Sequence, residues 1–364
     1  MREKLATVHD PRHPGYIQHK LADVLLIIIC AVMSGLDELC TIYAYAKNKA
    51  EFFRSQFGIE SIPSKPTLSR ILAMVDPKSV TEVMINLMKE QIEATGEVIA
   101  VDGKAIRSTS ETGKAHSALQ ILTAYLTESS VILAQEEIHD KTNEIPVFQE
   151  MLNHLDIKGK TVTADAMHCQ RETCRRIEKQ GGKYIFGLKE NQKSLYEDVS
   201  LYFQDTELCA NLETSCTEEE NKGRYEKRTC RKLTQLDWLE QKGLWPGLCS
   251  ILEVERVVVS GQKTSREVSY YISSSNISAE NFLNLVREHW KIESMHWMLD
   301  VVFCEDDCIM KSDAAHLTLN IFRKYAISMH RKYLSSQQKK SSVKTNMFDC
   351  LMNDSLLLKV IESG

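Results

Sequence analysis

Apolar residues in the first quarter of the chain recur at the spacing of an amphipathic helix. Such series run through residues 21–29 and 42–53, so we expect this region to be helical. A proline-containing break at residues 63–67 (PSKPT) supplies a Ser or Thr cap for a further short helix that carries Arg70. A turn followed by such a helix is similar to the second half of a helix-turn-helix. We therefore predict that residues 1–92 form a helical, DNA-binding domain.

After Gly96 the pattern changes to short runs rich in β-branched residues, which favour strands. Strand-like runs alternate with two helical runs in the order β-β-β-α-β-α-β, at residues 97–102, 118–126, 131–138, 144–155, 160–164, 170–179 and 183–188. This order predicts three antiparallel strands, with two further strands added in parallel beside the first through right-handed crossovers. We expect an α/β fold with a mixed five-stranded sheet.

Residues 196–280 break this rhythm. They contain an acidic stretch, a strand-like run at 224–231 and a hairpin-like run at 254–272 that turns at Gly261. We interpret them as a β-rich insertion in a core that spans residues 93–335.

Helical spacing returns near the end of the chain. Residues 281–300 form the first predicted helix, with Asn276 or Ser278 as its N-cap, and residues 314–333 form the second. We interpret residues 336–364 as a C-terminal tail.

The composition is that of an ordinary globular protein. The 364 residues include 45 Lys and Arg against 50 Asp and Glu, and 43% are hydrophobic, which excludes collagen-like and disordered classes and predicts about two domains. The most apolar run, residues 24–33, falls short of the roughly 20 residues that cross a membrane. The first residues lack the apolar segment of a secretion signal, so we expect a cytoplasmic protein with no membrane association, whose cysteines are reduced thiols.

Two segments are strongly basic although the net charge is -5. Residues 221–232 hold six Lys or Arg against one acid, and residues 323–344 hold seven and no acid. An acidic protein can still present basic strips to a polyanion such as a nucleic acid. The alternative is that both segments are solvated faces.

Three acidic residues stand out by their positions. Asp102 ends the first predicted strand and Asp165 ends the fourth, so both carboxylates are expected at one edge of the sheet, where they make a hard-oxygen site suited to Mg²⁺ or Mn²⁺. Glu293 lies in the helix at 281–300, on a predicted buried face where a carboxylate needs a partner. At helical spacing His289, Trp297 and Asp300 share that face, with His296 beside it. Each acid alone is more often a turn residue or a helix cap.

Several blocks together resemble the DDE transposases of the ISAs group, also called H-repeat-associated proteins. The blocks stand in family order, at residues 100–108 (AVDGKAIRS), 140–145 (DKTNEI), 162–170 (VTADAMHCQ), 187–192 (GLKENQ) and 289–301 (HWKIESMHWMLDV). Residues 10–12 and 63–70 are similar to the helical domain that precedes the core in that family. The resemblance covers about residues 8–335.

The resemblance implies a ribonuclease-H-like core in which Asp102, Asp165 and Glu293 form the DDE triad and hold two Mg²⁺ ions, for which Mn²⁺ can substitute. The resemblance further implies that these ions would activate a water and stabilise the leaving 3′-oxygen, without a covalent protein–DNA intermediate. The freed 3′-OH of the element end would then attack target DNA. Related transposases often show a Tyr-Arg-Glu-Lys signature around the Glu, whereas Val286, His289, Glu293 and Asp300 occupy those positions here.

The same reading yields candidate DNA contacts. Basic candidates for the developing phosphate charge are Lys104, Arg107, Lys189 and Arg224. Polar candidates are His168 and Gln170, which otherwise start a helix, and Asn191 and Gln192, which otherwise form a surface turn. Trp290 and Trp297 could stack on a flipped base, although packing of at least one against the sheet is favoured.

The expected partner is double-stranded DNA, namely the terminal inverted repeats of an insertion element and its target. Two ends must be brought together, so we expect a homodimer on DNA, associated with the nucleoid. Two alternatives remain open: a catalytically decayed DNA-binding protein, and a ribonuclease-H-like nuclease without strand transfer. A small-molecule metallohydrolase fits less well because it leaves the basic segments unexplained. The joining of a precut 3′-OH end to target DNA separates the transposase from the nuclease.

Overall fold

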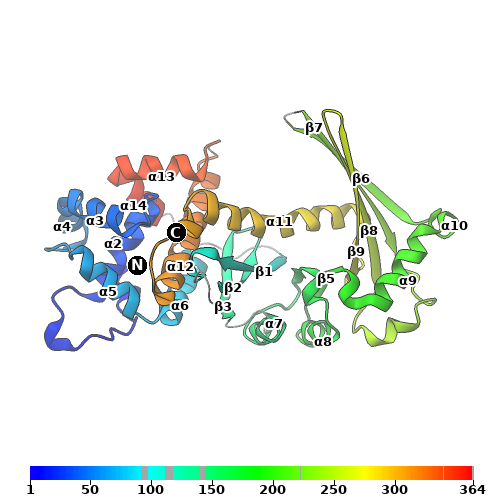
Figure 1. Ribbon diagram of the computed structural model, residues 1–364, viewed down its shortest axis with the longest axis horizontal. Helices are drawn as coiled ribbons and strands as arrows, with labels where there is room; N and C mark the ends of the chain where they lie inside the picture. Colours follow the sequence, from blue (N-terminus) through cyan, green and yellow to red (C-terminus); the bar gives the residue numbers. More distant parts are fainter. Residues whose placement is uncertain (92–96, 111–117, 139–143, 222, 339, 363–364) are drawn as a thin grey trace.

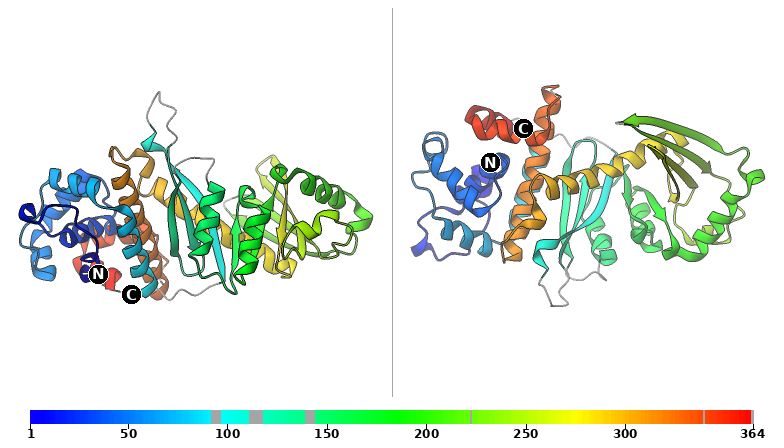
Figure 2. Two further views of the ribbon diagram at one scale, coloured as in Figure 1. Left: turned by 90° about the horizontal axis from the view of Figure 1, so that it is seen from below. Right: turned by 45° about the horizontal axis from the view of Figure 1, so that its top comes forward.

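The computed structural model describes residues 1–91, 97–110, 118–138, 144–221, 223–338 and 340–362. The expected domain boundary at 92/93, motif residues 140–143, and the basic residues Lys222 and Lys339 lie outside this part of the chain. The molecule is elongated, with helices at one end, a single large sheet through the middle, and long antiparallel strands at the other end (Figures 1 and 2).

The first 91 residues form helices at one end of the molecule, which confirms the prediction that this region is helical. These helices are α1 (Arg2–Leu5), α2 (Leu21–Met33), α3 (Leu39–Asn48), α4 (Ala50–Phe57), α5 (Lys65–Met74) and α6 (Pro77–Gln91). Every residue of α2 except Asp23 is buried, so this helix is apolar on all sides because it lies at the centre of the helical end. Helix α12 (Asp313–Ser336) packs against α2, α5 and α6 and closes this core.

The segment expected as a tail is folded. Residues 336–364 contain α13 (Val343–Met352) and α14 (Asp354–Glu362), which contact α12 and, through α13, also α2. Buried His330 of α12 makes two hydrogen bonds. Its Nε2 donates to the carbonyl of Met33 at 2.8 Å, and its Nδ1 accepts from the side-chain amide of Asn346 at 2.8 Å. The apolar residues of the last helices are thus part of the helical core, and both termini lie at this end (Figure 1).

The central sheet confirms the predicted five-strand order. Its first strands are β1 (Val98–Ile106), β2 (Leu119–Leu126), β3 (Val131–Ile138), β4 (Thr161–Ala164) and β5 (Lys183–Leu188). They are arranged β3-β2-β1-β4-β5. Strand β1 pairs antiparallel with β2 and parallel with β4, and β4 pairs parallel with β5.

The predicted insertion extends this sheet. Strands β6 (Glu213–Asn221), β7 (Arg224–Leu233), β8 (Ser250–Ser260) and β9 (Lys263–Ser273) continue it to nine strands, because β9 pairs antiparallel with β5. The acidic stretch was not predicted as a strand, yet it forms β6. Cross-strand pairing explains this, since Glu218 of β6 pairs with Lys227 of β7 at 2.8 Å.

The basic segment at 221–232 is neutralised within the same sheet, so its described residues do not form an unpaired basic strip. Each of its described basic side chains has a carboxylate partner, in the pairs Arg224–Glu226, Lys227–Glu218, Arg228–Glu226, Arg231–Glu253 and Lys232–Glu213. In the second basic segment, Arg323 and Lys324 are each only 1% exposed and so take no part in an exposed basic strip, whereas Lys340 and Lys344 are exposed. Arg323 pairs with Asp37 and Glu305 inside the protein.

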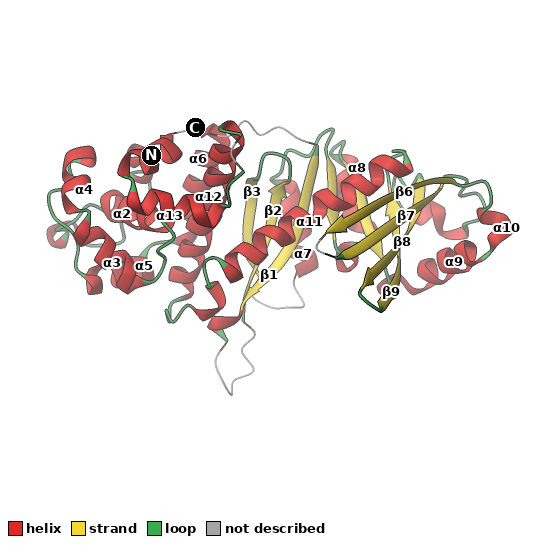
Figure 3. Ribbon diagram, turned by 90° about the horizontal axis from the view of Figure 1, so that it is seen from above, coloured by secondary structure: helices red, strands yellow, loops and turns green. Residues whose placement is uncertain are grey.

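Helices cover both faces of the sheet. Helices α7 (Glu144–Asn153) and α8 (Arg171–Lys179) lie on one face, and the long α11 (Ala279–Val301) crosses the other (Figures 1 and 3). The side chain of Ser278 accepts a hydrogen bond from the Asn281 amide, which confirms one of the two predicted N-caps. Helices α9 (Lys193–Gln204) and α10 (Thr206–Cys209) follow β5. Within the described residues, no helix has both the length and the apolar character that a membrane crossing requires.

Candidate active site

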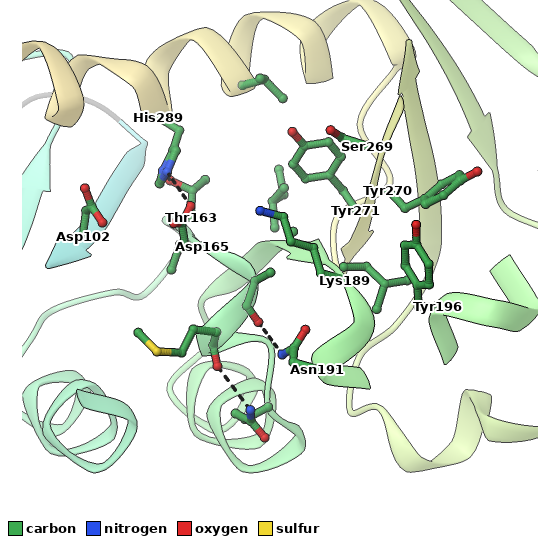
Figure 4. A pocket seen from close by; sticks show the side chains of 18 of the residues that line it. Asp102, Thr163, Asp165, Lys189, Asn191, Tyr196, Ser269, Tyr270, Tyr271 and His289 are labelled. Carbon is green, nitrogen blue, oxygen red and sulfur yellow. Dashed lines mark hydrogen bonds and ion pairs between the residues drawn. The ribbon is translucent and has the colours of Figure 1, made fainter. Parts of the chain in front are cut away.

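A cleft of about 1120 Å³ lies between the ends of β1, β4 and β5, strand β9 and helix α11. Asp102, Asp165 and Glu293 all line it, and the strand order predicts that the first two lie at one edge of the sheet. Figure 4 shows Asp102 and Asp165 on neighbouring elements, with His289 descending from α11 toward them and Tyr271 on the β9 side. The three acids are thus brought to one cleft from three separate stretches of sequence.

Asp102 lies within β1, although the sequence predicts it at the strand's end. The parallel pairing with β4 stops at Val101 opposite Ala164, while the antiparallel pairing with β2 continues to Ile106. Asp102 is therefore the first residue of β1 without a β4 partner. Its Oδ1 accepts a hydrogen bond from the Gly103 amide at 2.9 Å. The carboxylate stands where the parallel part of the sheet opens into the cleft.

Asp165 directly follows β4, as predicted, and precedes the short turn at Ala166–His168. Its side chain is 70% exposed. The ring of His289 lies between two groups on this strand end, with Nδ1 3.0 Å from the hydroxyl of Thr163 and Nε2 3.9 Å from Oδ1 of Asp165. The His289 imidazole holds the pKa of Asp165 below its usual value, so the carboxylate is ionised at neutral pH.

Helix α11 presents a row of polar side chains to the two strand ends. His289 reaches Asp165, His296 reaches Asp102 with Nδ1 3.3 Å from Oδ2, and Asp300 reaches Lys104 at 2.7 Å. Glu293 lies between the two histidines along the helix. It faces the open cleft, contrary to the expected buried face.

The two tryptophans of α11 differ from the favoured expectation that at least one of them packs against the sheet. Trp290 is 52% exposed and lines the cleft, and Trp297 is 59% exposed. Neither is buried against the sheet, and Trp297 does not share the row that contacts the strands.

The electrostatics of the cleft favour a cation. Partial desolvation raises the pKa of Glu293, and the negative charges of Asp102 and Asp165 raise it further. Carboxylate oxygens are the ligands that Mg²⁺ prefers, so the donor set fits this ion. Within the described residues, no three Asp, Glu, His or Cys side chains converge closely enough to hold a metal ion. The structure thus supplies the donor chemistry in one cleft without a gathered coordination sphere.

Lys104 does not point to a phosphate site. Its side chain is 8% exposed, and its ammonium group lies 2.7 Å from Asp300, 3.1 Å from Glu305 and 3.8 Å from Asp306. Burial opposes the charge, but Glu305 and Asp300 more than compensate and raise the pKa of Lys104. The ion pairs of Lys104 instead connect β1 to the C-terminal end of α11 and to the segment that follows it.

The other basic candidates differ in position. Arg107 has a side chain that is 84% exposed, with only a loose contact to Asp306 at 3.7 Å. Lys189 lines the cleft and favours the charged form of Asp165. Arg224 is at the start of β7, paired with Glu226 and not among the cleft residues. Arg70 is exposed on α5.

The polar candidates after Asp165 mostly hold the protein's own backbone. His168 is 1% exposed, so the expected DNA contact is wrong for this residue: its Nε2 lies 3.1 Å from Oε1 of Glu144. Asn191 donates to the carbonyl of Ala166 at 2.7 Å, and Gln192 donates to that of Cys169 at 2.9 Å. Gln170 lines the cleft, and its amide donates to the carbonyl of Met167.

Sequence reasoning gave no role to Glu144, although this residue lies in the quoted block at 140–145. The structure places it in the cleft lining, beside Gly103. His289 and His296 were assigned to a helix face without a role. Their spacing on the helix that carries Glu293 was the available signal.

The comparisons with known proteins agree with this geometry. A family described as "Transposase DDE domain" matches residues 93–329, and a second, described as "DDE_Tnp_1-associated", matches residues 2–88. The chain belongs to the DDE transposase family. It is a transposase, an enzyme that cleaves DNA, and this family generally uses divalent metal ions.

Curated relatives cover nearly the whole chain. The Escherichia coli K12 protein named "H repeat-associated putative transposase YhhI" is 35% identical over 87% of this chain and 86% of its own length. "Putative transposase YncI" of Escherichia coli O157:H7 is 30% identical over 97% and 93%, respectively. The relative "Inactive transposase YbfQ" of Escherichia coli K12 matches only 20% of this transposase, at 30% identity.

A solved structure shares the fold. The piggyBac transposase in a synaptic complex with hairpin DNA superposes with a TM-score of 0.50 and 10% identity, over 99% of this chain and 78% of that one. This likeness concerns the architecture alone and confirms the ribonuclease-H-like fold.

Proposed function

We propose that this transposase cleaves DNA at the ends of its own insertion element and joins the freed 3′-OH to target DNA, with Asp102, Asp165 and Glu293 as the residues that hold two Mg²⁺ ions. The observation that carries the proposal is the meeting of these three carboxylates in one cleft, from β1, the end of β4 and the middle of α11. The raised pKa of Glu293 supports it, because partial desolvation and then the negative charges of Asp102 and Asp165 disfavour its ionised form, and a bound cation would relieve that repulsion.

When bound, the ions would activate the attacking oxygen and stabilise the leaving one. The other side chains of the cleft would orient the carboxylates and contact the DNA. His289 and His296 orient the Asp165 and Asp102 carboxylates, to which they lie close. Lys189 and exposed Arg107 are suited to phosphate oxygens, and Gln170 lines the cleft where the DNA strand would pass. The half-exposed ring of Trp290 suits stacking on an unpaired base.

The rest of the chain would bind and bring together the DNA ends. We assign element-end recognition to residues 1–92, with Arg70 on α5 as a contact, and catalysis to residues 93–335. Two ends must react in one complex, so a homodimer on double-stranded DNA is proposed. Its place of action is the cytoplasm, on the nucleoid.

A cleavage assay tests the proposal. Duplex DNA carrying the sequence that flanks the gene is incubated with wild type or Asp165→Asn in Mg²⁺ or Mn²⁺. Cleavage at the element boundary by wild type alone is the expected result. Binding without cleavage by either protein would contradict catalysis and favour a decayed DNA-binding protein. A second substrate with a precut 3′-OH end tests joining, since cleavage without joining would indicate a nuclease.

A further inference from the structure

A hydrogen bond on the α7 side of the sheet joins the start of α7 to the turn that follows Asp165. Oε1 of Glu144, at the start of α7, lies 3.1 Å from Nε2 of His168. The two side chains are 14% and 1% exposed, respectively. Among the residues that the structure describes, the buried Nδ1 of His168 has no hydrogen-bond partner, so Nε2 is the nitrogen that carries the proton toward the carboxylate.

The Glu144 carboxylate lies close to Gly103 of β1. A Cβ atom built on Gly103 would lie 2.8 Å from Oε1 of Glu144, so a side chain at this position would push the Glu144 carboxylate aside. Gly103 directly follows Asp102, and successive strand residues face opposite sides of a sheet. The Glu144 carboxylate therefore lies beside the β1 backbone, on the side opposite to the one on which Asp102 meets His296.

The His168 end holds the turn that follows Asp165. The His168 amide donates to the carbonyl of Asp165 at 2.9 Å. The ring packs edge-on against Phe148 of α7, with 4.7 Å between ring centroids. The turn is therefore fixed by backbone, by packing and by the Glu144 carboxylate at once.

The position of this pair matters because the β1–β4 ladder has ended. Val101 opposite Ala164 is the last parallel pair, so ladder hydrogen bonds do not set the distance between the next two residues, Asp102 and Asp165. Beyond this point on the α7 side, the Glu144–His168 hydrogen bond joins the turn after Asp165 to a carboxylate that lies beside Gly103 of β1.

We propose that Glu144 and His168 are positioning residues that set the spacing of Asp102 and Asp165, and thereby the affinity for the two metal ions. This inference rests on the proposed function of the triad. Removal of a residue that orients a metal ligand typically lowers the metal affinity 10- to 100-fold. The carboxylate of Glu144 acts through His168 and Gly103, so no role as a direct ligand is assigned to it.

Mn²⁺ binding to the full chain, measured by electron paramagnetic resonance of the free ion without DNA, tests the inference. Wild type and Asp165→Asn establish first whether the triad binds Mn²⁺ at all. If wild type fails to bind, or Asp165→Asn binds as tightly as wild type, the proposed metal site fails and the inference fails with it. If the triad binds Mn²⁺, the Glu144 variants decide the inference on its own.

Glu144→Ala is expected to weaken Mn²⁺ binding by about 10-fold or more. Glu144→Gln keeps an oxygen that accepts from His168 Nε2, so it should retain affinity within about threefold of wild type. Glu150→Ala is the matched control, because Glu150 lies on the same helix in an exposed pair with His154 at 3.5 Å. Its Mn²⁺ affinity should equal that of wild type.

Three results would overturn the inference: unchanged affinity in Glu144→Ala, an equal loss in Glu150→Ala, or a loss in Glu144→Gln as large as in Glu144→Ala. Thermal unfolding in EDTA shows whether each variant is folded. Should Glu144→Ala not fold, Gly103→Ala provides the second test, since its methyl group displaces the Glu144 carboxylate. It should weaken Mn²⁺ binding by a similar factor, and unchanged affinity there would contradict the inference.

Discussion

Nδ1 of His296 lies 3.3 Å from Oδ2 of Asp102, and on the same helix His289 faces Asp165. Glu293 lies between the two histidines. A single helix therefore carries the third acid and also the two histidines that lie next to Asp102 and Asp165. Because α11 crosses the sheet at β1 (Figure 3), a small shift of this helix would move Glu293 and both histidines relative to Asp102 and Asp165. The arrangement makes the geometry of the cleft depend on how α11 is anchored.

Partial desolvation and the nearby carboxylates both disfavour the charge of Glu293, which predicts a gain of stability when this residue is neutralised. The pKa of Glu293 is raised in the folded chain, so its ionisation opposes folding at neutral pH, and this cost disappears as the pH falls and the carboxyl is protonated in both states. Glu293→Gln should therefore raise the Tm in EDTA by roughly 1–2 °C at pH 8, with a smaller difference at pH 5. Differential scanning calorimetry measures both.

The same variant should lose the response to metal. Mn²⁺ should raise the Tm of wild type, because a ligand that binds the folded state stabilises it, and should leave the Tm of Glu293→Gln nearly unchanged. A lower Tm of the variant in EDTA would mean that Glu293 stabilises the metal-free fold, contrary to the electrostatic argument.

Lys104 is predicted to support stability rather than DNA binding. Its ammonium is buried against Asp300 and Glu305, and removal of one partner from a buried ion pair costs about 3 kcal/mol or more. Lys104→Met should lower the free energy of unfolding in urea by about that amount. Glu305 keeps its contact with Arg323, which places the expected loss at the lower end.

Arg107 provides the contrasting prediction. Its side chain is 84% exposed, so Arg107→Ala should leave the urea midpoint unchanged. If it contacts a DNA phosphate, the slope of log K against log salt should fall by about one in magnitude. Fluorescence anisotropy with labelled element-end DNA in EDTA measures this slope. An unchanged slope would remove Arg107 from the DNA interface.

The local patterns that predict this fold are strong in the centre of the chain and weak at its edges. Strands β3 and β5 have the bounds that their β-branched runs indicate. Strand β6 was missed because its consecutive glutamates disfavour a strand when read alone. Their partners, such as Lys227, lie on another strand. Helices α13 and α14 were missed because the surface that buries them is formed by other helices, and one of these, α2, is distant in sequence.

For the candidate site, the sequence predicts which residues meet but not what each one contacts. Strand order alone brings Asp102 beside Asp165. The contacts of Lys104 and His168 depend on Glu305 and Glu144, which are distant in sequence and carry no local signal of pairing. Basic and polar residues near a predicted active site were therefore assigned to DNA when the protein itself uses them.

Lys324 predicts an unusual pH dependence of stability. It is 1% exposed, and its ammonium donates to the Thr123 hydroxyl at 2.8 Å and to the Gln135 side-chain oxygen at 2.7 Å. Burial lowers its pKa to about 7. Below pH 7 the lysine is charged in both the folded and the unfolded chain, and the cost of burying that charge is present in full. Between pH 7 and its ordinary value of 10.5 only the unfolded chain retains the proton, so the stability of wild type rises with pH relative to a variant without the lysine.

Lys324→Met tests this argument by urea unfolding at pH 6 and pH 9. The difference in free energy of unfolding, variant minus wild type, should be lower at pH 9 than at pH 6 by roughly 2–3 kcal/mol. Its absolute sign also depends on the two hydrogen-bond acceptors left behind, each of which costs about 1–3 kcal/mol, but these losses do not vary with pH. Lys344→Met, on the exposed surface of α13, is the control and should give the same difference at both pH values. Parallel curves for Lys324→Met and Lys344→Met would show that Lys324 keeps its proton inside the folded protein.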